Sequence, residues 1–188
     1  MPGRGRGWAV SEWESVARSL MEQRYRALVG YARMVAGSSV SAEDLVQEAL
    51  IATFSRPRGL ANIAVAEAYV RRAIVTRFLD STRKTNREPR AAKGALELVA
   101  EADHSTGVAD AATLHAALAR LTPRERACVV LRYLEGLSVS ETARTLDLAE
   151  GTVKRYVSDG IAKLNGLLGT DEAVDEAQFV RVAKGGVR

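Results

Sequence analysis

The 188-residue sequence is poor in cysteine, histidine, proline and aromatic residues. Its single cysteine, Cys128, excludes a disulfide framework, and one Cys with two distant His residues cannot close a structural zinc site. Aromatic residues make up 5% of the chain, which is thin for the core of a β-sandwich or barrel. Nothing approaches the apolar run that spans a bilayer, and the basic start at 1–8 lacks the apolar stretch of a secretory signal. We therefore expect a cytoplasmic protein with no membrane insertion, metal or cofactor.

Helix-forming residues are abundant, and apolar residues recur at helical spacing. Hydrophobic residues account for 47% of the chain and charged residues for 27%, which is ordinary for a globular protein. The spacing of three and four residues predicts amphipathic helices and shows no strand pattern. The sequence therefore predicts an all-α fold. The expected helices cover 12–36, 42–54, 66–84, 110–121, 122–134, 138–146 and 150–168.

Three helix starts carry a capping signal in the sequence. Ser41 precedes Asp44 by three residues, Thr122 precedes Glu125 with a proline between them, and Ser138 precedes Glu141. A hydroxyl side chain at the N-cap accepts a hydrogen bond from the backbone three residues on. Gly136 is a plausible helix end, and Asp110 a possible start.

The charge pattern divides the chain into two modules. No Lys or Arg occurs from 94 to 117, whereas both flanking stretches are basic. We interpret this shift as a domain boundary. The expected organisation is a disordered start (1–10), an N-terminal domain (11–93), a flexible linker (94–110), a C-terminal domain (111–169) and a tail (170–188).

The last two helices have the form of a helix-turn-helix. A short capped helix, a turn of three or four residues and a longer helix make this unit. It places the second helix in the major groove of DNA, where basic and hydroxyl side chains reach base edges and phosphates. The alternative is an ordinary helical hairpin with a solvated polar face. The candidate DNA-binding residues are Glu150, Thr152, Lys154, Arg155 and Ser158.

Two helices of the N-terminal half have faces of opposite charge. The helix at 42–54 shows Asp44, Gln47 and Glu48 and no basic residue, which suits docking on a basic partner. Carboxylates in a first helical turn also occur simply because the helix dipole favours them. The helix at 66–84 is basic, which suits phosphate binding, although a solvated face is the alternative.

Three motifs of the C-terminal half resemble a known family. Leu121-Thr-Pro-Arg-Glu-Arg, Leu134-Glu-Gly-Leu-Ser and Glu150-Gly-Thr-Val-Lys-Arg resemble the C-terminal domain of extracytoplasmic-function sigma factors of the sigma-70 family. They also resemble the output domain of LuxR-type response regulators. The N-terminal half shows no receiver-domain pattern. Its segments 42–50 and 67–83 instead resemble the sigma-factor segments that grip core RNA polymerase and read the minus-10 promoter element. The resemblance covers about 25–168.

The resemblance implies roles for particular residues. Asp44, Gln47 and Glu48 would bind the clamp helices of the largest polymerase subunit. The last helix would enter the minus-35 major groove, and its domain would sit on the flap of the second-largest subunit. An anti-sigma factor is a further expected partner. Tyr69 and Thr76 stand where the family commonly has Trp and Asn, which leaves the preferred minus-10 base open. The residues expected at the minus-10 element are Asn62, Arg71, Arg72, Thr76, Arg77, Asp80, Arg83 and Lys84.

The expected function is that of an alternative sigma factor, which binds core polymerase and promoter DNA and directs transcription initiation. One alternative is a stand-alone helix-turn-helix regulator of the LuxR type. Another is a non-initiating interaction protein that titrates an anti-sigma factor. An enzyme is disfavoured, because the sequence has no Ser-His-Asp set, phosphate-binding glycine loop or metal cluster. We expect no catalytic residue and no small-molecule substrate.

Overall fold

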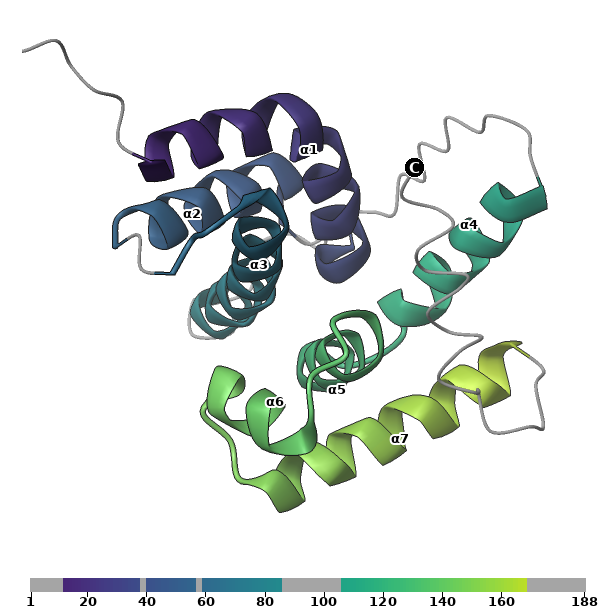
Figure 1. Cartoon of the computed structure of the whole chain (residues 1–188). Helices are drawn as coiled ribbons and strands as arrows, with labels where there is room; N and C mark the ends of the chain where they lie inside the picture. Colours follow the sequence, from purple (N-terminus) through teal and green to yellow (C-terminus); the bar gives the residue numbers. More distant parts are fainter. Residues whose placement is uncertain (1–11, 38–39, 57–58, 86–105, 169–188) are drawn as a thin grey trace, which may run out of the picture.

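The computed structural model describes residues 12–37, 40–56, 59–85 and 106–168. Within these ranges every regular element is helical, so the expected all-α fold is confirmed (Figure 1). The expected 1–10 and 170–188 segments and most of the expected linker lie outside the described residues. The elements in chain order are α1 (Glu12–Ala36), α2 (Ala42–Phe54), α3 (Ile63–Thr85), α4 (Thr106–Ala119), α5 (Pro123–Val129), the π-helical turn η1 (Val130–Leu134), α6 (Val139–Leu146) and α7 (Glu150–Leu168).

Helices α1, α2 and α3 pack together as the N-terminal unit. Each helix contributes one apolar face, with Leu28, Val46 and Ile74 completely buried between them. Ser41 begins α2 as expected, since its side chain accepts a hydrogen bond from the Asp44 N–H. Trp13 stacks on Phe54 and ties the start of α1 to the end of α2.

The C-terminal unit comprises α4 to α7, in which α7 packs on α4, α5 and α6. Both expected capping boxes are present, at the start of α5 and at the start of α6. Gly160 lets α7 approach α5 closely, since a Cβ there would lie 2.8 Å from the Val129 side chain. Glu125 bonds Lys163 of α7 at 2.7 and 2.8 Å through its two carboxylate oxygens. Burial raises the pKa of Glu125, but hydrogen bonds from Lys163 and Thr122 outweigh this and hold it below its ordinary value.

Two helix starts differ from the expectation. Helix α3 begins at Ile63 rather than Ala66, because the Asn62 side chain caps it by accepting the Val65 N–H at 3.0 Å. Helix α4 begins at Thr106, so Asp110 is an internal residue and not an N-cap. Alanines around Asp110 favour helix, and an acidic residue is well tolerated near a helix start.

The helix that starts at Pro123 does not remain α-helical to its end. Its last turn, η1, is π-helical, with the Glu135 N–H bonded to the Val130 carbonyl at 3.2 Å. Gly136 ends the turn at a φ of +65°, as expected for a glycine at this position. The sequence did not predict the π turn. Such a turn conserves the apolar stripe and changes only which backbone groups are bonded, so the spacing of apolar residues does not reveal it.

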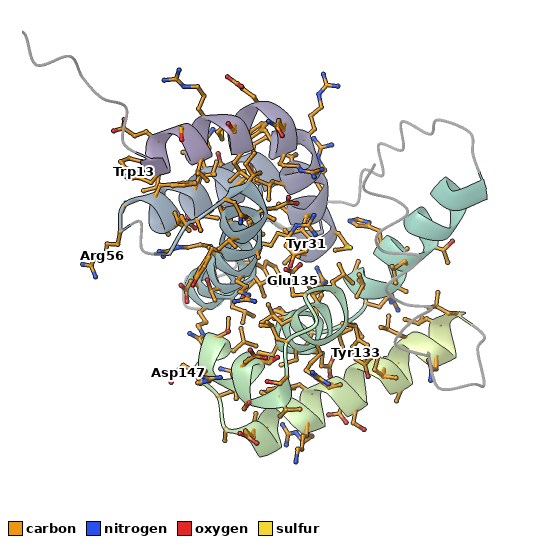
Figure 2. All side chains as sticks on the ribbon, viewed as in Figure 1. Trp13, Tyr31, Arg56, Tyr133, Glu135 and Asp147 are labelled. Carbon is orange, nitrogen blue, oxygen red and sulfur yellow. The ribbon has the colours of Figure 1, made fainter. Side chains whose placement is uncertain are left out.

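The N-terminal and C-terminal units also contact each other. Helix α3 packs against α5 and α6, and α1 packs against α4. Figure 2 shows Tyr31 and Glu135 near this boundary. The two domains therefore share an interface in this structure, in addition to the chain connection between α3 and α4.

Cys128 is completely buried in α5. Burial raises the pKa of its thiol to about 12, so the reactive thiolate is scarce near neutral pH. We expect the native protein to react with a thiol-specific reagent at pH 8 much more slowly than the protein unfolded in guanidinium chloride. The release of the reagent's chromophore over time measures this difference. A native rate equal to the unfolded rate would contradict the buried position.

Candidate functional site

The acidic face of α2 lies on the solvent side of the N-terminal unit. Asp44, Gln47 and Glu48 are exposed, whereas Leu45 and Val46 on the opposite side are buried. Among the described residues, no hydrogen bond or ion pair engages the carboxylates of Asp44 and Glu48. The structure thus brings the three predicted residues together on one surface that has no partner in the described chain.

Ile51 extends this acidic face by one turn. It follows Asp44, Gln47 and Glu48 in the same helical row, and 67% of its surface is exposed. An exposed large apolar side chain beside charged ones is typical of a protein-binding surface. Ile51 was not among the residues predicted from the sequence, although an apolar residue in the polar row of an amphipathic helix could have indicated it.

The predicted DNA-binding residues of helix α3 differ in their exposure and in their contacts. Arg77 and Arg83 are exposed and lie 3.9 and 3.6 Å from Asp80, which makes weak surface ion pairs. Arg71 is only 21% exposed and bonds Glu67 at 2.8 Å. Asn62 serves as the helix cap, and the side chain of Lys84 lies outside the described residues.

A hollow of about 440 Å³ opens beside the middle of α3. Arg72 and Thr76 line it, which places two predicted minus-10 residues at one concave surface. The Thr76 hydroxyl donates to the Ala73 carbonyl at 2.9 Å, so only its lone pairs are available to a ligand. Arg56, Tyr69 and Thr145, which were not among the predicted site residues, also line this hollow. The complete lining is Ala52, Thr53, Arg56, Leu60, Tyr69, Arg72, Ala73, Thr76 and Thr145.

The helix-turn-helix is formed by α6, a turn at Asp147 and α7. Asp147 ends α6 in the left-handed region at a φ of 52°, which an aspartate tolerates better than most residues. Val153 is completely buried and fixes the rotation of α7. As a result, Lys154 and Arg155 face outward near the start of this helix. Glu150 and Ser158 are also exposed, and Thr152 is half-buried.

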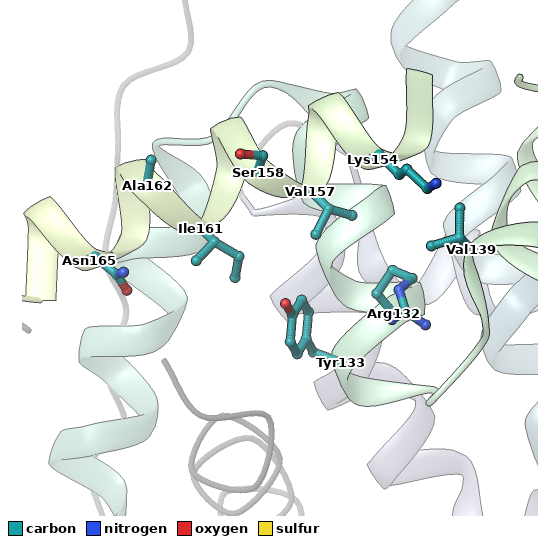
Figure 3. A pocket seen from close by; sticks show the side chains of 9 residues that line it. All are labelled: Arg132, Tyr133, Val139, Lys154, Val157, Ser158, Ile161, Ala162 and Asn165. Carbon is teal, nitrogen blue, oxygen red and sulfur yellow. The ribbon is translucent and has the colours of Figure 1, made fainter. Parts of the chain in front are cut away.

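A second hollow of about 440 Å³ lies between α7 and the π turn (Figure 3). Lys154 and Ser158 line one end, and Asn165 lies at the other end. Arg132 points into the space from η1, and its guanidinium also donates to the Leu137 carbonyl. Two basic side chains therefore flank the exposed start of α7.

In the part of the chain that the structure describes, no group of three or more His, Cys, Asp or Glu residues could hold a metal ion. None of the described helices has the length and apolar character needed to cross a membrane.

Comparison with protein families identifies both helical units. Residues 20–88 match the model of sigma-70 region 2, and residues 111–164 match the model of sigma-70 region 4. The first match contains the acidic face of α2 and the whole of α3, and the second contains the helix-turn-helix.

Individual relatives agree with this assignment. The RNA polymerase sigma-E factor of Streptomyces avermitilis is 35% identical over 156 residues, which cover 82% of this chain and 84% of the relative. The ECF sigma factor SigM of Mycobacterium tuberculosis is 31% identical, with coverage of 80% and 76%. A solved structure of the sigma factor RpoE with the anti-sigma factor NepR from Bartonella quintana has the same fold. Its TM-score is 0.55 at 22% identity, over 82% of this chain and 98% of that chain. The chain belongs to the extracytoplasmic-function sigma factors of the sigma-70 family, and it is an alternative sigma factor that directs transcription initiation.

Proposed function

We propose that this sigma factor binds core polymerase through the acidic face of α2. Asp44, Gln47 and Glu48 supply the charge, and Ile51 supplies an apolar contact at the end of the row. The observation that carries this proposal is the exposure of all four side chains on a helix whose other side is buried. The family resemblance implies the clamp helices of the largest subunit as the partner surface, and the flap of the second-largest subunit as the support of the C-terminal domain.

The minus-10 element is contacted by α3 and the hollow beside it. Arg72, Arg77 and Arg83 would bind phosphates, and the hollow would receive a base taken out of the stack. Tyr69, which is 46% exposed at the rim, offers a ring for stacking. Because the Thr76 hydroxyl donates to its own helix, Thr76 would select a base that presents an amino group.

The minus-35 element is contacted by the start of α7. Lys154 and Arg155 would reach phosphates or guanine edges, and Thr152 a phosphate or a thymine methyl. Glu150 and Ser158 complete the exposed face. This activity requires no catalytic residue, cofactor or small-molecule substrate, and it takes place in the cytoplasm. An anti-sigma factor is a natural regulator of such a protein.

Footprinting of the holoenzyme on a promoter fragment tests these assignments against a stand-alone regulator. We expect protection of two unlike elements, one bound as duplex by α7 and one opened beside α3. A dimeric helix-turn-helix regulator would instead protect two related half-sites about one helical turn apart without polymerase. That symmetric pattern would overturn the proposal.

Replacing Lys154 by alanine removes one phosphate contact. We expect promoter binding by the holoenzyme to weaken, with the slope of log K against log salt concentration less steep by about 0.9. Arg26→Ala is the control, since it removes the same charge from the exposed side of α1. The measurement is promoter affinity over a series of salt concentrations. Equal slopes for Lys154→Ala and the unchanged protein would contradict a phosphate contact.

A further inference from the structure

The hollow between α7 and the π turn has an apolar floor that the described residues cover only in part (Figure 3). Tyr133, Val157 and Ile161 line it, and each is partly buried and packs against the hydrophobic core. Covering such a surface with a further apolar segment is favourable, because apolar area is then removed from water. The hollow is therefore a groove in which a chain segment can dock.

Two cationic side chains and no carboxylate border this groove. Arg132 points into it from η1, and Lys154 is exposed near the start of α7. None of the nine described residues that line the groove is acidic. Among the described residues, neither Arg132 nor Lys154 has a carboxylate partner. The groove thus favours an occupant that combines negative charge with apolar side chains.

The other end of the groove holds an acceptor that lacks a donor. The side-chain oxygen of Asn165 is buried, and no described residue donates a hydrogen bond to it. A buried polar atom of this kind costs free energy unless a donor reaches it. Asn165 lies in the last turn of α7, which ends at Leu168, so the segment that follows the helix begins near this end of the groove.

The segment that follows α7 has the composition that the groove favours. Residues 171–176 read Asp-Glu-Ala-Val-Asp-Glu, with four carboxylates and no basic residue. A further apolar stretch, Phe-Val-Arg-Val, follows at 179–182. Gly169 comes directly after the last residue of α7, and a glycine in that position readily adopts the left-handed backbone that turns a chain at a helix end.

The lengths agree with a return of this segment along α7. Lys154 and Asn165 are separated by three turns of helix, which is about 16 Å along the axis. An extended chain covers about 3.3 Å per residue, so residues 170–175 span about the same distance. A returning segment therefore brings Asp175 and Glu176 to the two cations, with the valine before them over the apolar floor.

We propose that the groove between α7 and the π turn is a docking site for the chain's own tail segment, 171–182. The adjacent carboxylates at 175–176 pair there with Lys154 and Arg132. Promoter phosphates must then displace the tail before Lys154 contacts DNA. The docking itself depends only on the groove and the tail, whereas its consequence for DNA rests on the proposed minus-35 role of Lys154.

Paramagnetic relaxation in the whole chain tests the docking directly. A nitroxide label is attached to Gln178→Cys, and Cys128 stays unlabelled under native conditions because its thiol is completely buried. We expect strong broadening of the backbone amide signals of Tyr133 and Ile161, and none for Arg18 in the first half of α1. Equal broadening across the protein, or none at Tyr133 and Ile161, would overturn the docking.

Neutralising two tail carboxylates in the labelled chain tests the charge pairing. Asp175→Asn with Glu176→Gln should remove most of the broadening at Ile161, since both ion pairs are lost. Glu14→Gln with Glu22→Gln is the matched control, because it makes the same charge change at exposed positions of α1 and should retain the broadening. Undiminished broadening in the tail variant would overturn the pairing.

Exchanging the charges of one pair identifies its members. Lys154→Glu in the labelled chain should release the tail and reduce the broadening at Ile161. Adding Glu176→Lys should restore it, because the two residues then attract each other with reversed signs. A double variant that stays as weakly broadened as Lys154→Glu alone would contradict this pair.

The tail of a second copy is the other source of the same chemistry, and a mixed sample separates the two. Spin-labelled protein without isotope is mixed with isotope-labelled protein without the spin label, so broadening reports only contacts between copies. We expect little broadening at Tyr133 and Ile161 in this sample. Broadening as strong as in the singly labelled chain would overturn docking within one chain.

Binding of the free protein to a random-sequence duplex tests the consequence for DNA. Asp175→Asn with Glu176→Gln should bind at least about threefold more tightly than the α1 control pair, because a larger fraction of molecules has Lys154 available. Fluorescence anisotropy of labelled DNA measures both affinities. Equal affinities would overturn the shielding of Lys154. If Lys154→Ala also leaves DNA binding unchanged, the minus-35 role of Lys154 fails, and the docking measured by the nitroxide label stands separately.

Discussion

The double replacement Asp44→Lys and Glu48→Lys is expected to reduce affinity for core polymerase by at least about tenfold. The reason is that the two carboxylates project from α2 and would meet a basic surface, where reversed charges repel. Promoter-specific transcription should fall with the affinity at limiting protein. Fluorescence anisotropy of the labelled protein, titrated with core polymerase, measures the change.

The same replacement should leave the fold intact. A basic residue in the first turn of a helix costs about 0.3–1 kcal/mol, which applies to position 44 but not to position 48 in the next turn. The Ser41 cap uses the backbone N–H of residue 44, which is retained. Glu22→Lys on exposed α1 controls for net charge and should bind polymerase normally. Unchanged affinity in the double variant, with normal circular dichroism, would remove α2 from the polymerase interface.

The Arg126→Met variant should lose about 2–4 kcal/mol of stability. It leaves buried carbonyls at the ends of α1 and α4 without a donor, and each such group costs about 1–3 kcal/mol. Methionine fills part of the space, which keeps the loss from being greater. Although burial lowers the pKa of Arg126, an arginine remains charged at neutral pH. Thermal unfolding followed by circular dichroism should show a Tm lower by several degrees.

Arg124→Met provides the matched control for that loss. Arg124 lies two residues away on α5 and is exposed, so its replacement should change Tm little. Equal effects of the two replacements would contradict the role of Arg126 as a cap for helix ends of both domains.

Local signals predicted most of the helical structure from the sequence. The caps at Thr122 and Ser138 act within four residues of the chain, so a pattern in the sequence is sufficient to find them. The same holds for the exposure of Asp44 and Glu48, which follows from helical periodicity. Asn62 shows the limit of this reasoning. Its amide was assigned to DNA, but a nearby backbone N–H uses its oxygen.

Contacts between the domains could not be predicted in this way. Arg126 and Val35 lie 91 residues apart in sequence, and His115 and Arg33 lie 82 apart. The periodic spacing of apolar residues cannot reveal a contact between positions so far apart in the sequence. For the same reason the sequence favoured a solvent-facing Arg71 on a basic helix. In the structure this side chain is engaged by Glu67 of its own helix and by Glu135 of the other domain.

Transcription with purified core polymerase and a pool of genomic promoter fragments tests the central assignment most directly. The reaction is run with and without this protein, and the transcript starts are mapped. We predict protein-dependent transcripts whose promoters share a minus-35 and a minus-10 motif, with a minus-10 base that presents an amino group at the position read by Thr76. Binding to core polymerase without any protein-dependent transcript would contradict the account and favour a non-initiating interaction protein.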